Sequence, residues 1–560
     1  MPHDKQPWIL GISASHNGSA CLLRGDEIVV AIQEERLSRF KRQRIFGAGP
    51  SLAIDYCLKY SGIDPGELDT IVLCVQGEAR SHLHDVRRDP SLNVLTHRIP
   101  TMTIPHHFGH ALSAFATSGF NEAAVLVVDG TGSPVEDFIP AEQKLINGNF
   151  ADGWETISLY SACGTSVVPL EKHVAERGAW LDQRNPGMPT FGSLGGMFSA
   201  VAQQIFGEPM DAGKVMGLAP YGEPHIPASD FFEISSGQFS FKNNVPLQFP
   251  HDQRWPNHAR EYDILACSVQ AALDVALMYL VEHLHDLSGS ENLCYAGGVA
   301  LNSVTNERII RESGFRNVYI IPPAEDSGAA IGAAYYGLWQ LTGCNSQRRI
   351  TDDAFGRTYT PADVSAALNH ADNIRVISST NVIADTVDLL CEGKTVGWFD
   401  GGSELGPRAL GHRSILCDPR RSDAREILNS RVKMREGFRP FAPTVLLEEA
   451  ANWFEFGNSP SESPFMLRVC EVKAEQRNKV PAVVHVDGTG RLQTVDLNSN
   501  RRFYDLIRRF HEKTGVPMLL NTSFNVMGQP IIETPGDALE CLLKTGLDCC
   551  VFEDVIGFKE

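Results

Sequence analysis

The chain has 560 residues, of which 43% are hydrophobic and 21% charged, ordinary shares for a soluble globular protein with ample core. Its length fits three or four domains, and two large α/β domains fit equally well. The formal net charge of -19 argues against a nucleic-acid or anionic-membrane partner. The 13 cysteines include no CxxC pair, and no apolar run reaches about 18 residues. We therefore expect reduced thiols, no membrane span and a cytoplasmic location.

The N-terminal segment predicts a hairpin of strands 8–12 and 20–23 around the tip Ser15-His16-Asn17-Gly18-Ser19. Asn-Gly is a strong hairpin signal. Actin-like and sugar-kinase-like ATPases hold nucleotide phosphates with such a polar tip, and a plain surface hairpin is the equal alternative. A third strand, 27–33, leads into the charged run 34–41. That run is interpreted as a solvated face, with an anion contact as the less supported alternative.

Residues 105–132 combine candidate metal ligands. His106 and His110 are four residues apart, so a helix would place both imidazoles on one face. The buried strand predicted at 123–128 ends on Asp129, at the edge where open α/β sheets carry their chemistry. Asp326 follows another predicted strand and either caps the next helix or adds a second carboxylate. Two imidazoles and two carboxylates suit Fe, Mn or Zn better than Ca; a chance histidine pair is the alternative.

Three glycine turns are candidate anion contacts. In Asp129-Gly130-Thr131-Gly132 the glycines let backbone N–H groups approach an anion. Lys214 lies in a glycine-punctuated stretch, 211–222, that lacks the Walker A spacing and reads equally as a turn-rich linker. Gly297-Gly298 follow a predicted strand, where paired glycines permit close approach of a nucleotide.

Two further stretches predict little regular structure. Residues 133–190 are expected to be irregular, with one strand near 155–160, and such long connections tend to be functional or inserted. Residues 341–359 are expected to form a linker.

Beyond residue 395 the chain gains basic residues beside glycine turns and an Asn-Thr-Ser segment. An acidic protein with this arrangement is predicted to bind a small phosphorylated anion there; a set of surface ion pairs is the alternative. The residues concerned are Arg408, Lys433, Arg435, Arg439, Arg491, Asn521 and Ser523.

The sequence blocks from about residue 9 to 540 resemble, in order, the nodulation-type and antibiotic-biosynthesis O-carbamoyltransferase family. The blocks are PHHFGHALSAF, LVVDGTG, GKVMGLAPYG, YAGGVALNS, PAEDSGAAIGAA, ELGPRALGHRSIL, VKMREGFRPFAP, HVDGTGRLQTV and LNTSFNVMGQPIIETP. The resemblance implies an α/β protein with an α+β second domain. Residues 1–345 would form an actin/sugar-kinase-like ATPase-fold domain for metal-dependent carbamoyl transfer. Residues 346–560 would form a smaller carbamoyl phosphate- and ATP-binding domain that makes carbamoyl-adenylate.

The resemblance also implies substrates and site residues. Carbamoyl phosphate and ATP with Mg would give carbamoyl-adenylate, whose carbamoyl group passes to a hydroxyl of an antibiotic-type small molecule. Fe(II) or another divalent transition metal would bind His106, His110, Asp129 and Asp326. His16, Lys433 and Arg439 would be catalytic, with His16 as the candidate base. Carbamoyl phosphate would bind Arg408, Lys433, Arg439, Arg491, Asn521 and Ser523, and the nucleotide would bind Gly130, Thr131, Lys214, Gly297, Gly298 and Asn302.

Two positions depart from the family pattern. Gln529 stands where a glutamate is frequent and His412 where an asparagine is frequent. The main rival function is a tRNA threonylcarbamoyl-adenosine-type enzyme, disfavoured by the acidity and by both domains lying in one chain. A hydrogenase-maturation carbamoyltransferase would carry CxxC pairs, and a non-enzymatic ATP-dependent sensor would leave the second domain's arginines without a purpose. No nucleic acid or membrane partner is expected, and a homodimer is left open.

Overall fold

The structure is a computed structural model that describes residues 6–45, 49–76, 89–146, 153–176, 191–242, 244–250, 254–345 and 347–560. Its contacts divide the chain into two compact units. Unit 1 comprises Met1–Ala31 and Arg44–Ile350, and unit 2 comprises Ile32–Gln43 and Thr351–Glu560. The N-terminal run of charges therefore belongs to the unit that is formed mainly by the C-terminal part of the chain.

The first sheet of unit 1 has the strand order β3-β2-β1-β4-β5. Strand β1 pairs antiparallel with β2 and parallel with β4, and β4 pairs parallel with β5. The strands are β1 (Trp8–Ser13), β2 (Ser19–Arg24), β3 (Glu27–Gln33), β4 (Thr70–Val75) and β5 (Thr101–Pro105). Strands β1 and β2 thus form a hairpin with the polar tip 14–18, and β4 and β5 continue the sheet as parallel strands.

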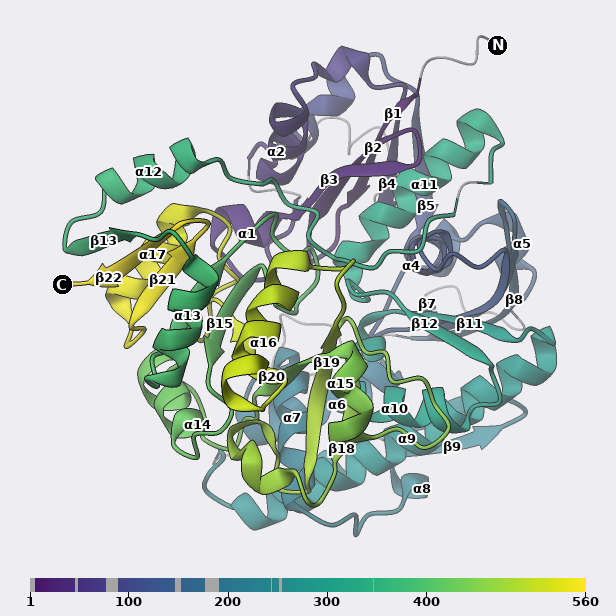
Figure 1. Cartoon of the computed structure of the whole chain (residues 1–560). Coiled ribbons are helices and arrows are strands. Elements are labelled where there is room, and N and C mark those ends of the chain that lie inside the picture. The colour runs from purple at the N-terminus through teal and green to yellow at the C-terminus, as the bar shows by residue number, and fades with distance from the viewer. Residues whose placement is uncertain are drawn as a thin grey trace. The chain divides into compact units, whose positions relative to one another are not determined.

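The second sheet repeats this order with β6 in the place of β1. It runs β12-β11-β6-β7-β8, with β6 antiparallel to β7 and parallel to β11. The strands are β6 (Glu122–Val128), β7 (Trp154–Cys163), β8 (Ser166–Ala175), β11 (Asn292–Ala296) and β12 (Asn317–Ile320) (Figure 1). This duplicated order is the arrangement expected of the actin- and sugar-kinase-like ATPase fold, so the predicted fold class is confirmed.

The strand expected near 155–160 is present as β7, but the irregular structure expected after it is wrong, because β8 follows directly. Strands β7 and β8 are ten residues each and form an antiparallel pair. Glu155 and Ser158 on β7 are buried and polar, so β7 lacks the alternation by which a half-buried strand is recognised. Residues 147–152 and 177–190 lie outside the described residues.

The helices of unit 1 cover its two sheets. They are α2 (Leu52–Ser61), α4 (His106–Ala116), α5 (Pro140–Gln143), α6 (Leu194–Phe206), α7 (Ala212–Leu218), α8 (Ala228–Phe231), α9 (Ala259–Ser288), α10 (Ser303–Glu312) and α11 (Ala329–Thr342); a short hairpin joins β9 (Phe232–Ser235) to β10 (Gln238–Phe241). Within the described residues α9 alone is long and apolar enough to cross a membrane. Since 67% of its apolar window is buried inside the protein, α9 has the character of a core helix.

Unit 2 is built on a ten-stranded sheet with the order β13-β22-β21-β14-β15-β20-β16-β19-β18-β17. Its strands are β13 (Ile374–Ser378), β14 (Val396–Phe399), β15 (Arg413–Cys417), β16 (Ala442–Leu446), β17 (Phe454–Glu455), β18 (Arg468–Val472), β19 (Thr489–Val495), β20 (Met518–Ser523), β21 (Cys549–Phe552) and β22 (Val555–Lys559). Its helices are α1 (Glu34–Ser38), α12 (Pro361–Asn369), α13 (Val382–Cys391), α14 (Ala424–Ile427), α15 (Leu447–Trp453), α16 (Arg501–Thr514) and α17 (Pro535–Lys544).

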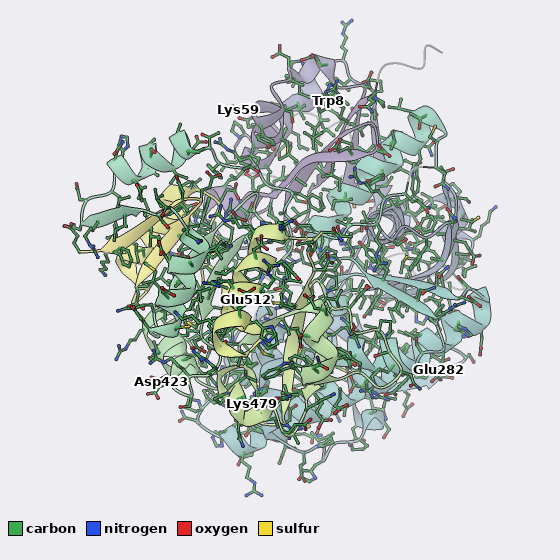
Figure 2. All side chains as sticks on the ribbon, viewed as in Figure 1. Trp8, Lys59, Glu282, Asp423, Lys479 and Glu512 are labelled. Atoms are coloured by element: carbon green, nitrogen blue, oxygen red, sulfur yellow. The ribbon has the colours of Figure 1, made fainter. Side chains whose placement is uncertain are left out.

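Helix α16 shows how the sheet of unit 2 is covered. It buries Phe503, Leu506, Ile507 and Phe510, which recur at the three- and four-residue steps of one helix face. Exposed charged side chains such as Lys59 and Asp423 lie on the outside of their units (Figure 2). The second sheet domain predicted for the C-terminal part is therefore present, with its own core.

Helices α4 and α11 approach so closely that only glycine fits between them. A Cβ on Gly332 of α11 would lie 2.0 Å from the carbonyl oxygen of Gly109 and 2.7 Å from the backbone nitrogen of Ser113, both on α4. Because the obstacle at Gly332 is backbone, a side chain there requires the helices to separate.

We expect Gly332→Ala to lower the free energy of unfolding by about 1–3 kcal/mol, because the methyl group overpacks the contact between α4 and α11. Gly66→Ala is the matched control, since Gly66 is exposed and a Cβ there would have no neighbouring atom within 4 Å. Urea unfolding of the two variants measures the difference. Equal stabilities would contradict the close packing.

Candidate functional site

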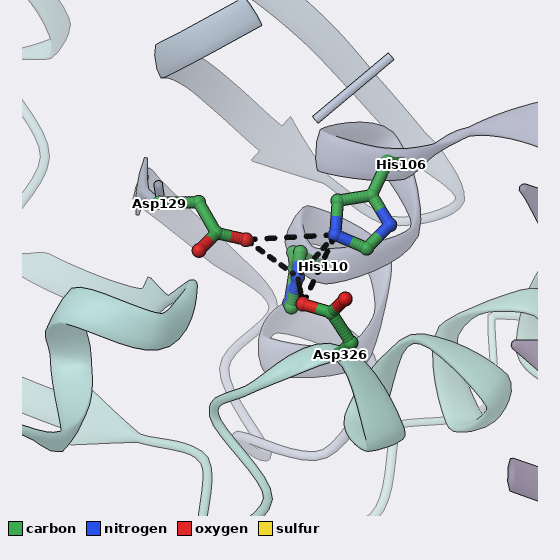
Figure 3. Close-up of side chains that lie close together, drawn as sticks. All are labelled: His106, His110, Asp129 and Asp326. Atoms are coloured by element: carbon green, nitrogen blue, oxygen red, sulfur yellow. Dashed lines mark hydrogen bonds and ion pairs between the residues drawn. The ribbon is translucent and has the colours of Figure 1, made fainter. Parts of the chain in front are cut away.

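Four predicted metal ligands converge in unit 1 at the carboxyl ends of β6 and β12 (Figure 3). Helix α4 begins at His106 and carries His110 one turn later. Asp129 directly follows β6, and Asp326 opens the short helix η9 (Asp326–Gly328) after β12. One ligand atom from each residue lies within 4.8 Å of all the others.

The ligand atoms face one another at separations that suit a transition metal. The Nε2 atoms of His106 and His110 are 3.2 Å apart, and His106 Nε2 is 3.2 Å from Asp326 Oδ1. Asp129 Oδ2 lies 3.5 Å from each Nε2 atom. Ligands about 2.1 Å from a tetrahedral metal are about 3.4 Å apart, close to these values.

Asp129 shows that the donor set fits a cation. Its Oδ1 accepts hydrogen bonds from the backbone N–H groups of Gly130, at 2.7 Å, and Gly298, at 3.3 Å. Its Oδ2 is buried without a hydrogen-bond partner in the described structure and faces the two imidazoles. A buried carboxylate oxygen needs a partner, and a divalent cation at this point supplies one.

The same charges make the pocket attractive to positive charge. Burial opposes protonation of His106, but Asp326 and Asp129 outweigh it and hold the pKa of His106 well above its usual range. The neighbouring His107 is hydrogen-bonded to Ser158 instead, with 2.8 Å between His107 Nδ1 and Ser158 Oγ. Burial lowers the pKa of His107 to about 3, so it is neutral.

The hairpin tip between β1 and β2 reaches the metal ligands. His16 Nδ1 lies 3.0 Å from Asp326 Oδ2, and the His16 side chain is 33% exposed. Asn17 donates to Glu325 Oε2 at 3.0 Å. His16 is therefore accessible to a substrate while it contacts the candidate metal centre.

The predicted nucleotide contacts near Asp129 have internal partners. The N–H groups of Gly130 and Gly298 donate to the Asp129 carboxylate, and the carbonyl oxygen of Thr131 accepts from Gln76. Gly297 has a φ of 95°, and a Cβ there would lie 2.2 Å from the carbonyl oxygen of Val128. These turns shape the carboxylate site; their nucleotide role stays a prediction.

Asn302 and Lys214 also contact neighbouring side chains. Asn302 caps α10 and exchanges hydrogen bonds with Gln270 on α9. Lys214 forms an ion pair with Asp211 at 2.8 Å, and its ammonium lies over the ring of Phe206. Nucleotide binding by either residue stays a prediction.

In unit 2, Lys433 is buried and its ammonium is surrounded by neutral oxygens. It donates to the carbonyl and hydroxyl oxygens of Ser523, at 2.7 and 3.1 Å, and to the carbonyl and side-chain oxygens of Asn525, at 2.9 and 2.5 Å. Burial first, then repulsion by Arg435, lowers the pKa of Lys433 well below its usual range. An anion placed here would favour the protonated form of Lys433, which burial and Arg435 disfavour.

Four arginines next to Lys433 repel one another. Burial and three neighbouring guanidinium groups lower the pKa of Arg491 well below its usual range; the neighbours are Arg408, Arg435 and Arg439. Burial and Arg439 likewise lower the pKa of Arg435 to about 9 and that of Arg408 to about 10. Arg491 Nε is buried with no hydrogen-bond partner among the described residues. We call Arg408, Lys433, Arg435, Arg439 and Arg491 the cation cluster.

Asn521 and Ser523 lie on β20, in the ten-stranded sheet whose strand β19 carries Arg491. Asn521 donates to the carbonyl oxygen of Ala409, next to Arg408, at 3.1 Å, and its Oδ1 is buried without a partner in the described part of the chain. The structure therefore brings the six predicted carbamoyl phosphate residues into one unit, while their role in binding stays a prediction.

Sequence reasoning missed the residues that hold the Arg408 loop. The Glu404 carboxylate accepts from the N–H groups of Leu410 and His412, at 2.6 and 3.0 Å. Arg36, buried in unit 2, donates to the carbonyl oxygens of Glu404 and Gly406. The interpretation of 34–41 as a solvated face is therefore wrong for Arg36, because its buried guanidinium satisfies loop carbonyls.

Asp352 and Asp353 show that the predicted linker 341–359 also holds this loop. Asp353 Oδ2 accepts from the N–H of Gly406 at 2.8 Å, and Asp352 Oδ1 lies 3.2 Å from His412 Nε2. Burial lowers the pKa of His412, but Asp352 outweighs burial and raises it to about 9. His412 is therefore an imidazolium near neutral pH.

Comparison with known proteins places the chain in a family. The carbamoyltransferase N-terminus family matches residues 8–87 and 91–335, and the carbamoyltransferase C-terminus family matches residues 387–559. Since these matches cover most of its length, the chain belongs to the carbamoyltransferase family, as its sequence blocks predict.

Two relatives illustrate the likeness. Nodulation protein NolNO of Sinorhizobium fredii is 33% identical over 569 residues, which cover 95% of this chain and 77% of that protein. Uncharacterized protein sll1178 of Synechocystis sp. is 33% identical over 638 residues, which cover 98% of this chain and 96% of that protein. The crystal structure of full-length HypF in the phosphate- and nucleotide-bound form aligns with a TM-score of 0.41 and 12% identity, over 61% of this chain and 57% of that one.

We expect His110→Ala to weaken binding of a divalent transition metal by more than the ~10–100-fold that an outer-shell change costs, because a ligand is lost. Metal analysis of the purified protein, and titration with Co(II), measure this. His285→Ala, at a half-exposed histidine of α9, is the control. Full metal content in His110→Ala would contradict the assignment.

The His412–Asp352 pair predicts a pH dependence of stability. A raised pKa stabilises the folded state fully below about 6.5, and this contribution disappears as the pH rises through about 9. We expect His412→Asn to be less stable than the wild type at pH 6.5, by on the order of 1–2 kcal/mol since Asp352 is partly exposed. Urea unfolding across this pH range should show the gap closing; a constant gap would contradict the pair.

Proposed function

We propose that this carbamoyltransferase is an ATP- and metal-dependent O-carbamoyltransferase that forms carbamoyl-adenylate from carbamoyl phosphate and ATP. The carbamoyl group then passes to a hydroxyl of a small natural product of the antibiotic type. Unit 2 would bind carbamoyl phosphate and activate the carbamoyl group. Unit 1 would carry out the metal-dependent transfer.

The cation cluster is the observation that carries the proposal. Its members lower one another's pKa. Glu436 opposes this effect in part: it raises the pKa of Arg435, and its Oε2 lies 3.9 Å from Arg439 Nη1. Arginine keeps its proton at any ordinary pH, so the repulsion remains in the folded protein. A phosphate group offers several oxygens to guanidinium forks and cancels this repulsion, which supports carbamoyl phosphate or ATP as the ligand.

The proposed reaction balances in three steps. Water cleaves carbamoyl phosphate to carbamate and phosphate. A carbamate oxygen then attacks the α-phosphorus of ATP, pyrophosphate leaves, and a mixed anhydride with a good leaving group forms. Finally the acceptor hydroxyl oxygen attacks the carbamoyl carbon, AMP leaves, and the hydroxyl proton passes to a base. Free carbamate decomposes in water, so an enzyme that holds carbamate beside ATP protects it and also accelerates the reaction by positioning the two reactants.

The chain's own groups fit parts of these steps. Lys433 and Arg439 would hold the charge that develops on the phosphate during cleavage. His16 is our candidate for the base, because it is partly exposed and oriented by Asp326. A divalent cation held by His106, His110, Asp129 and Asp326 would act as a Lewis acid toward an anhydride or phosphate oxygen.

We expect Arg491→Ala to bind carbamoyl phosphate about 10–100-fold more weakly, since a hydrogen bond between charged groups contributes about 1.5–3 kcal/mol. Calorimetric titration measures the affinity, and mass spectrometry of a panel of hydroxylated natural products detects the added carbamoyl group. Arg501→Ala, at an exposed arginine of α16, is the control. Unchanged affinity in Arg491→Ala would contradict the anion site.

A further inference from the structure

The helix that carries both metal-binding histidines begins without a cap of its own. The residue before α4 is Pro105, which has no side-chain oxygen and makes no capping hydrogen bond. The first N–H groups of a helix have no partner within the helix and must find one elsewhere. In α4 these groups include the N–H of His106 itself.

Two residues distant in sequence supply the missing acceptors. Ser133 Oγ accepts from the N–H of His106 at 2.9 Å, and Glu155 Oε1 accepts from the N–H of His107 at 2.9 Å. Glu155 Oε1 also accepts from the N–H of Ser133 at 2.8 Å, while Ser133 Oγ donates to the carbonyl oxygen of Val75. The first turn of α4 is thus joined to the ends of β4 and β6 and to the start of β7.

Gly132 packs too closely against Glu155 and His107 to be replaced by a residue with a side chain. A Cβ on Gly132 would lie 2.6 Å from Glu155 Oε1 and 2.6 Å from His107 Cδ2. The second glycine of the Asp129-Gly130-Thr131-Gly132 turn therefore makes room for the Glu155 carboxylate.

Glu155 is charged although it is completely buried. Its Oε2 forms an ion pair with Lys172, whose ammonium also lies 2.9 Å from Glu142 Oε1 and 4.5 Å from the ring centre of Phe138. Glu142 in turn accepts from the hydroxyl of Tyr160 at 2.8 Å. A negative carboxylate at a helix N-terminus is favourable, and Lys172 supplies its counter-charge.

We infer that Glu155 is a positioning residue for the metal centre: it fixes the first turn of α4 so that His106 and His110 face Asp129 and Asp326. The inference rests on the proposed metal site. Glu142 shares the buried ion pair with Lys172, yet its hydrogen bonds go to Tyr160 and the backbone of Ile139, not to α4. A variant at Glu142 is therefore the control: it disturbs the buried ion pair without removing a hydrogen bond to α4.

The test compares Glu155→Gln with Glu142→Gln in the full chain by two measurements. The first is hydrogen exchange of the backbone amides in peptides covering 105–116, in metal-free protein. The second is the affinity for Co(II), from its visible absorption. For Glu155→Gln we expect faster exchange in the first turn of α4 and about 10–100-fold weaker Co(II) binding, the usual effect of an outer-shell change. Glu142→Gln should lose stability but keep both wild-type values.

Equal changes in both variants, or no change in either, would overturn the inference. If Glu155→Gln does not fold, Ser133→Ala tests the same point, because it removes the acceptor of the His106 N–H and keeps the buried ion pairs. Ser133→Thr, which keeps the hydroxyl, should restore wild-type exchange. If the wild type bound no Co(II) while the exchange difference persisted, the metal assignment would fall and the positioning role would stand.

Discussion

Both candidate sites depend on one constraint: ionised side chains that are removed from water need a partner of opposite charge. In unit 1 the buried charges have both signs: two carboxylates face two imidazoles, and Glu155 faces Lys172. In unit 2 the cation cluster gathers charges of one sign around the buried Lys433, and its members repel. Removing a charge from water is costly, so the first arrangement favours a cation and the second favours an anion. These arrangements support the metal proposed for unit 1 and the anion proposed for unit 2.

Much of the metal centre follows from local sequence rules. A four-residue histidine step on a helix and carboxylates that end buried strands make His106, His110, Asp129 and Asp326 candidate neighbours, since parallel strands end at one edge, and the family resemblance selects this set. The fold class follows from the sequence blocks and is visible in the repeated strand order of the two sheets.

The supporting residues could not be found in this way. Glu155 lies in the strand expected near 155–160 and Lys172 in β8, which the sequence pattern does not predict, and neither pattern indicates that these two charged side chains are buried. Arg36 belongs to a run of charges, and such runs are usually solvated. In each case the partner is distant in sequence: Arg36 bonds the carbonyl oxygen of Gly406, and Glu155 bonds the N–H of His107. A sequence signal for such pairs would need related sequences that vary together.

Formation of a carbamoyl-adenylate is the central claim, and isotope exchange tests it most directly. The purified chain is incubated with ATP and labelled pyrophosphate, with and without carbamoyl phosphate. Reversible attack of carbamate on the α-phosphorus of ATP predicts that label enters ATP only when carbamoyl phosphate is present. Absence of exchange under both conditions, in protein that contains its metal, would contradict the account.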